Sequence, residues 1–172
     1  MFVLGVDPGL SRCGYGVVTP SGGQGLVATA AGVIETDPKA PVPERLLTLQ
    51  RELRALVAEV APSVVVVERV FFQVNAKTAV PVCQASGLAL VAAAEAGCEV
   101  AQYSADEVKQ ALVGYGSATK RQVQQMVASV LSLSVPPSPP DAADALALAV
   151  CHLHGAGLRV AMAGARALGG GA

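Results

Sequence analysis

Four carboxylates in this sequence stand where their residue type and position could do chemistry. Asp7 directly follows an apolar run at residues 2–6. Glu68 directly follows a second apolar run, at residues 64–67. An acid at the end of a core strand is partly desolvated, and desolvation makes an isolated carboxylate costly. Two such acids on adjacent strands would repel each other unless a cation lies between them.

Asp141 and Asp144 form a second pair near the C-terminus. Their i, i+3 spacing places them on one face of a helix, in a first turn where the helix dipole favours anions. An alternative is that Asp141 or Ser138 merely caps this helix and Asp144 is solvated. The apolar residues that follow, at 145–149, favour a position of Asp144 near the protein interior.

The donor set of these four acids indicates a hard cation. Carboxylates without matching His or Cys residues suit Mg²⁺, and Mn²⁺ as its substitute. Two such ions about 3.5–4 Å apart can activate a water and stabilise the leaving oxygen of a phosphodiester. The sequence contains no G-x-S-x-G motif and no Cys/His pairing for a nucleophilic mechanism. We therefore expect metal-dependent hydrolysis, with two Mg²⁺ ions per active site.

The composition limits the class of protein. The 172 residues fit one domain, which we place at 1–156, followed by an Ala/Gly-rich tail at 157–172. A hydrophobic fraction of 52% with a net charge of −1 excludes general disorder. The neutral balance argues against nucleic-acid binding through bulk positive charge. Setting aside the four candidate ligands leaves 12 basic against nine acidic residues, so binding would depend on a few placed cations.

The location expected from the sequence is the cytoplasm. No apolar run approaches the roughly 18–20 residues that span a bilayer, and the N-terminus lacks the basic region of a signal peptide. The four cysteines show no metal-ligand spacing, which is typical of buried thiols in a reducing compartment. We expect His152 and His154 at the surface or at a helix end rather than as ligands.

The elements that must position the acids follow from periodicity and turn signals. Residues 2–6, 14–19 and 25–35 predict three antiparallel strands joined by tight turns. The rest of the chain alternates helices and strands, at 43–60 (helix), 64–67 (strand), 75–96 (helix), 98–103 (strand), 104–112, 119–131 and 141–154 (helices). This order predicts an α/β protein with a mixed sheet and helices on both faces.

Five sequence segments together resemble one known family. They are GVDPGLSRCGYG at 5–16, VERVFF at 67–72, VKQ at 108–110, GYGSATK at 114–120 and PDAADALA at 140–147. Each segment alone is weak, but their order and intervals over residues 2–154 are specific. The chain resembles the RuvC family of Holliday-junction resolvases. The resemblance implies a ribonuclease-H-like fold with a five-stranded mixed sheet, and symmetric, metal-dependent cleavage of four-way junctions in recombination and repair.

The resemblance also implies roles for individual residues. Asp7, Glu68, Asp141 and Asp144 match the family's four catalytic, magnesium-binding acids. Phe71 matches an aromatic residue that stacks on a base near the junction centre; the alternative is that the ring belongs to the core.

Several basic residues match or flank the same motifs. Lys109 and Lys120 match basic positions near the scissile phosphate, where the alternative is a solvated helix face. We expect Arg69 and Arg121, with Arg12 and Lys77, to lie close to the DNA surface.

Expected partners follow from the symmetry of a four-way junction. Two matched nicks are achieved economically by a homodimer with two active sites, and the family is dimeric. The Ala-rich helix at 75–96 is our candidate for the dimer contact. The resemblance further implies a T-rich preferred cleavage sequence and cooperation with the branch-migration helicase complex of RuvA and RuvB.

Three other functions remain open on the sequence. An ATP-binding protein of the actin and sugar-kinase superfamily would need a second domain and a second D-x-G motif. A non-catalytic junction-binding subunit would not need all four acids. A ribonuclease-H-like nuclease for another branched or hybrid nucleic acid would share the fold and the metals, so only an assay separates it.

Overall fold

Three antiparallel strands form the first half of the sheet. The structure, a computed structural model, describes residues 1–23, 25–70 and 76–169, with side chains described from 79 in the second helix and up to 155 in the last. β1 (Val3–Asp7) pairs with β2 (Arg12–Pro20), which pairs with β3 (Leu26–Glu35). The meander expected at the N-terminus is therefore confirmed, and only β2 is longer than expected.

Two parallel strands complete the sheet. β4 (Val64–Glu68) lies beside β1, and β5 (Glu99–Tyr103) lies beside β4, which gives the order β3-β2-β1-β4-β5. In this register Val6 pairs with Val67, so the next residues, Asp7 and Glu68, leave the sheet at the same edge. The four buried valines that begin β4 suit this central position, because both faces of the strand are covered.

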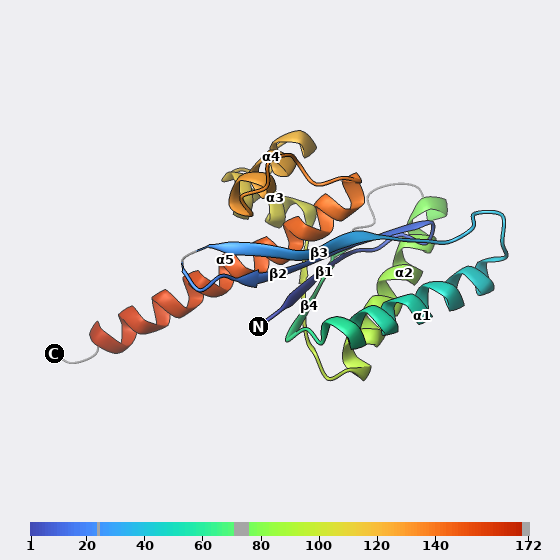
Figure 1. Ribbon diagram of the computed structural model, residues 1–172, viewed down its shortest axis with the longest axis horizontal. Coiled ribbons are helices and arrows are strands. Elements are labelled where there is room, and N and C mark those ends of the chain that lie inside the picture. Colours follow the sequence, from blue (N-terminus) through green and yellow to red (C-terminus); the bar gives the residue numbers. More distant parts are fainter. Residues whose placement is uncertain (24, 71–75, 170–172) are drawn as a thin grey trace.

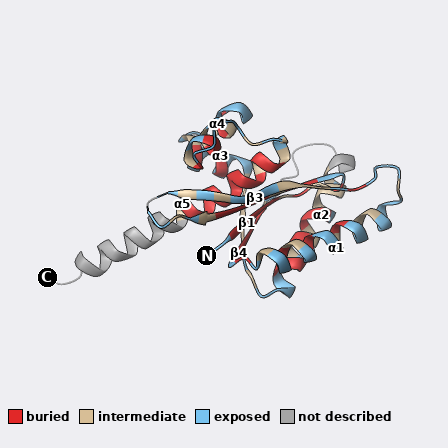
Figure 2. Ribbon diagram, viewed as in Figure 1, coloured by how far each residue is buried: buried red, intermediate tan, exposed pale blue. Residues whose placement is uncertain are grey.

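Helices cover both faces of the sheet (Figure 1). One face carries α1 (Val42–Val60) and α2 (Ala76–Glu95). The other carries α3 (Ala105–Val113), α4 (Lys120–Val130) and α5 (Pro140–Gly169). The buried residues form one core on each side of the sheet (Figure 2). The expected α/β architecture is confirmed, and none of the described helices is long and apolar enough to cross a bilayer.

The two helices that follow β5 begin and end for local reasons. Ser104 caps α3 and Thr119 caps α4, each in a reciprocal capping box with the residue three positions on. Gly114 ends α3 in the left-handed conformation at φ 92°, which glycine adopts without a Cβ penalty. These short, well-defined helices hold Lys109 and Lys120 beside α5.

The last helix differs from the expected one. It continues past 154 and through the proposed tail boundary, to Gly169. His152 is buried rather than at a surface or helix end, and its Nδ1 lies 3.1 Å from the Tyr103 hydroxyl. The expectation for His152 was wrong because α5 packs directly on the sheet at this point, whereas His154 is exposed as expected. All four cysteines are free, with Cys13 and Cys151 buried.

Glycines in β1 and β2 allow α5 to approach this closely. A Cβ at Gly5 would lie 2.0 Å from the carbonyl oxygen of Ala145. A Cβ at Gly14 would lie 2.1 Å from the carbonyl oxygen of Asp141. Both distances are impossible for a real side chain, so only glycine permits this packing. The first turns of α5 are thereby held directly over β1, which ends at Asp7, and over β2.

Candidate active site

Asp7 and Glu68 form the part of the site that lies on the sheet. Both are half-buried, each at the last position of a buried strand. Burial, and then the nearby charge of Glu68 and a hydrogen bond with it, raise the pKa of Asp7 from 3.8 to about 8. Asp144 and Asp141 raise it further in the same direction. Without a cation, Asp7 is therefore expected to hold a proton at neutral pH, first because it is buried and second because the neighbouring strand end carries Glu68.

Asp141 and Asp144 come to the same place from the first turns of α5, and each is paired with a cation. Arg12 Nε donates to Asp141 Oδ2 over 3.0 Å, and Lys120 Nζ lies 2.5 Å from Asp144 Oδ2. Both acidic side chains are less than one-third exposed. Neither is a solvated surface acid, so the second pair also belongs to the site.

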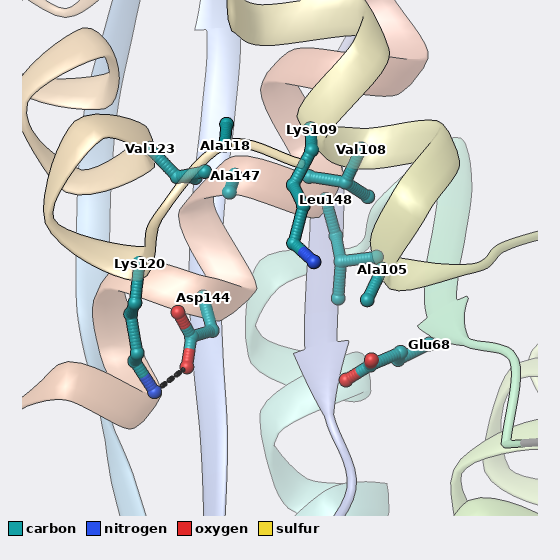
Figure 3. Close-up of a pocket in the computed structure, with 10 residues that line it drawn as sticks. All are labelled: Glu68, Ala105, Val108, Lys109, Ala118, Lys120, Val123, Asp144, Ala147 and Leu148. Atoms are coloured by element: carbon teal, nitrogen blue, oxygen red, sulfur yellow. Dashed lines mark ion pairs between the residues drawn. The ribbon is translucent and has the colours of Figure 1, made fainter. Parts of the chain in front are cut away.

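A pocket opens between α3, α4 and α5 beside these acids (Figure 3). Its volume is about 310 Å³. Glu68 and Asp144 face it, and Lys109 and Lys120 reach it from α3 and α4. Its floor is apolar, formed by Ala105, Val108, Ala118, Val123, Ala147 and Leu148. The pocket thus combines carboxylates, ammonium groups and an apolar surface, which suits a sugar-phosphate better than an uncharged ligand.

Two residues near the acids have connections that sequence reasoning missed. Arg12 bridges Asp141 and Glu35, the last residue of β3. The sequence placed Arg12 only near the expected DNA surface, and it assigned nothing to Glu35. A signal for Glu35 existed, because it ends a strand with an acid as Asp7 and Glu68 do. Its pairing with Arg12 follows from their cross-strand register in β2 and β3.

Comparison with known proteins decides the family. The profile of the family described as crossover junction endodeoxyribonuclease RuvC matches residues 3–152. The chain belongs to the RuvC family. The matched range spans the positions of the four candidate acids, both lysines and Phe71.

Individual RuvC proteins are similar over nearly the whole chain. Crossover junction endodeoxyribonuclease RuvC of Salinispora arenicola is 52% identical over 165 residues, covering 96% of this chain and 94% of the relative. The Thermus thermophilus RuvC structure has a TM-score of 0.84 at 38% identity, covering 92% and 96%. T. thermophilus RuvC in complex with Holliday junction substrate has a TM-score of 0.83 at 35% identity, with the same coverage. The ribonuclease-H-like fold implied by the resemblance is thus confirmed.

The donor set fits the metal ions of such a nuclease, although the acids do not form a closed cluster. All four donors are carboxylates, and burial, followed by the charges of the other three acids, raises the pKa of Asp7. Among the described residues, no three His, Cys, Asp or Glu side chains are grouped closely enough to hold an ion. Arg12 and Lys120 engage Asp141 and Asp144 instead. Binding a cation therefore requires these pairs to rearrange.

The structure places the candidate DNA-contacting residues of this RuvC chain in different surroundings. Lys109 lines the pocket and pairs with Asp106 of its own helix at 3.2 Å. Arg69 lies 3.5 Å from Glu107 and donates to the Gln102 carbonyl oxygen, so it also braces β4 against β5 and α3.

Of the three other candidates, the structure describes the side chain of Arg121 alone. Arg121 is exposed at the start of α4. Phe71 lies outside the described residues, as does the side chain of Lys77.

The raised pKa of Asp7 predicts an unusual dependence of stability on pH. The folded state holds this proton from about pH 4 up to about 8, whereas the unfolded chain releases it near 3.8. The folded metal-free protein therefore binds more protons in this window, and its free energy of unfolding falls as the pH rises. Urea unfolding in EDTA, compared between wild type and Asp7→Asn, should show the variant gaining relative stability from pH 5 to 8. A difference that does not change with pH would contradict the protonation of Asp7.

Proposed function

We propose that this chain resolves four-way DNA junctions by symmetric, metal-dependent hydrolysis of phosphodiester bonds in recombination and repair. The observation that carries the proposal is that two strand ends and one helix bring Glu68, Asp141 and Asp144 near enough to Asp7 for each of them to raise its pKa. The family supplies the substrate, since T. thermophilus RuvC has a structure in complex with Holliday junction substrate. Endonuclease activity at crossover junctions is the activity for which this family is named.

The four carboxylates would hold the metal ions. Metal dependence belongs to this nuclease family, and the oxygen-only donors favour two Mg²⁺ ions, with Mn²⁺ as a substitute. When bound, these ions supply an activated water and stabilise the leaving oxygen. Asp7 and Glu68 provide the fixed side of the site because they end central strands. Asp141 and Asp144 provide the other side, on a helix held in place by glycines.

The two lysines would act on the DNA backbone. Lys120 reaches the pocket mouth with 59% of its side chain exposed, and its ammonium group already lies against Asp144. If Asp144 held a cation, Lys120 would be free to hold the scissile phosphate or stabilise developing negative charge. Lys109 enters the same pocket from α3 and would contact the adjacent phosphate.

Further DNA contacts would come from residues around the pocket. Arg69 and Arg121 are exposed and would bind backbone phosphates. Phe71, three residues beyond Glu68, would present its ring to an unstacked base near the junction centre.

Two copies of the chain would match the symmetry of the substrate. We infer a homodimer in which α2 forms the contact, because its sequence is rich in alanine and Val80 and Val91 expose about half of their side-chain surface. Each copy would then cut one strand. Cooperation with the RuvA–RuvB branch-migration complex and a cytoplasmic location complete the proposal, on the strength of the family.

The experiment that tests this function is a cutting assay on a synthetic four-way junction. Purified protein with Mg²⁺ should place two symmetric nicks whose products a DNA ligase can reseal. Linear duplex and RNA–DNA hybrid of the same sequence are the matched substrates, and they should remain uncut. An intact junction at saturating Mg²⁺ and Mn²⁺ would contradict the nuclease function. Equal cutting of duplex or hybrid would contradict the specificity and favour the alternative nuclease.

Phe71→Ala is expected to reduce junction cutting by about tenfold or more, while the melting temperature changes by less than 2 °C. Loss of base stacking is worth about 1–3 kcal/mol, which corresponds to roughly 5- to 150-fold in rate or affinity. Single-turnover cutting and thermal unfolding measure the two effects. Phe72→Ala is the matched control, since it removes the same ring one position further along. A large drop in melting temperature for Phe71→Ala would instead place the ring in the core.

A further inference from the structure

Arg12 holds one of the four catalytic acids through a bridge between two strands and α5. Its Nε donates to Asp141 Oδ2 over 3.0 Å, and its Nη1 contacts Glu35 Oε1. Arg12 begins β2 and Glu35 ends β3, where the two residues pair across the sheet. Asp141, 129 positions away in the sequence, reaches them because Gly14 lets α5 lie on β2.

This bridge competes with metal binding at Asp141. A carboxylate oxygen that accepts from a guanidinium has fewer lone pairs for a cation, and the positive charge beside it repels a divalent ion. Arg12 stays charged at every accessible pH, so the competition does not switch off by titration. Something else must draw Arg12 away from Asp141 before this acid can serve as a full ligand.

The anion best placed to do so is a DNA phosphate. The Arg12 side chain is 44% exposed, so it is accessible to a backbone lying across this edge of the sheet. A guanidinium binds phosphate with the same two-pronged geometry that it uses for carboxylates. Glu35, 62% exposed, pairs with the same guanidinium and would keep the arginine at this edge when it leaves Asp141.

We propose that Arg12 is a positioning residue that couples metal binding to DNA binding. In the free protein it occupies Asp141 and weakens the metal site. When a backbone phosphate binds Arg12, Asp141 is released to the metal, so DNA and metal each increase the affinity for the other. This proposal rests on the proposed function, because it needs both a metal site and a DNA substrate. It would limit full metal loading to protein that is already on DNA.

Two substitutions should shift metal affinity in opposite directions. Arg12→Gln removes the competitor, so free protein should bind Mn²⁺ at least about fivefold more tightly than wild type, the lower end of typical couplings between sites. Glu35→Gln removes the second partner and leaves Arg12 to Asp141 alone, so Mn²⁺ affinity should fall. Titration of the free Mn²⁺ signal in electron paramagnetic resonance measures both without any cutting. Arg54→Gln is the matched control, because it breaks an exposed Arg–Glu pair between α1 and α2.

The same titration with a four-way junction tests the coupling itself. The junction should tighten Mn²⁺ binding by wild type several-fold and by Arg12→Gln much less. Only samples in which a gel shows an intact junction after the titration are counted. Unchanged or weaker Mn²⁺ binding by free Arg12→Gln would overturn the proposal, as would equal coupling in both proteins or tighter binding by Glu35→Gln. Junction cutting by wild type in Mg²⁺, assayed in parallel, separates these results from a failure of the proposed function.

Discussion

Asp7→Asn is expected to reduce junction cutting on the order of 10³-fold while junction affinity stays within about twofold of wild type. Asparagine keeps the shape of the side chain but replaces a charged oxygen ligand by a neutral amide. Asp7 is half-buried at the end of β1 and is not among the residues that line the pocket with Lys109 and Lys120, so its replacement should leave these cations in place. Single-turnover cutting of a labelled junction and fluorescence anisotropy without divalent metal measure the two quantities.

The same substitution should not destabilise the fold. Burial makes the charged form of Asp7 unfavourable, so a neutral amide at this position removes a cost. Asp37→Asn, which changes an exposed loop acid, is the control and should cut like wild type. If junction affinity fell as far as cutting, Asp7 would shape the DNA-binding surface rather than hold metal. A lower melting temperature at pH 8 would show that its carboxylate has a structural role.

The strand-end acids could be predicted from the sequence because their cause is local. An apolar run of β-strand length terminated by Asp or Glu fixes both the strand and the acid at its end. The parallel pairing of β1 with β4 then brings Asp7 and Glu68 to one edge. The helix-borne pair followed from i, i+3 spacing together with the apolar residues after it.

The pairings of these acids could not be predicted, because they depend on packing between distant segments. Arg12 meets Asp141 only where α5 crosses β2, and Lys120 meets Asp144 only where α4 lies against α5. His152 was misjudged for the same reason. The position of His152 near the end of an apolar stretch suggested exposure. The helix α5 in fact continues beyond this residue and holds it against Tyr103.

The glycines beneath α5 lead to a second large effect. Gly14→Ala is expected to reduce cutting by more than tenfold and to destabilise the protein by about 1–3 kcal/mol, the usual cost of overpacking. The new Cβ would lie 2.1 Å from the Asp141 carbonyl oxygen and 2.5 Å from its carbonyl carbon, so the backbone of α5 must move. Gly14 also pairs with Asp7 across β1 and β2, so any shift separates the two acids. A misplacement of about 1 Å in an active site can cost 10²-fold in rate.

Gly22→Ala distinguishes this steric effect from a general effect of replacing glycine. A Cβ at Gly22 meets no atom within 4 Å, and the residue lies in the turn between β2 and β3, so alanine should change the free energy of unfolding by less than about 1 kcal/mol. Urea unfolding and single-turnover cutting of both variants measure the contrast. If Gly14→Ala matched wild type in both measurements, α5 would be able to shift without disturbing the site. The position of Asp141 would then not depend on contact between α5 and β2. If Gly14→Ala instead lost cutting while its stability stayed unchanged, the effect would come from misalignment of the acids alone.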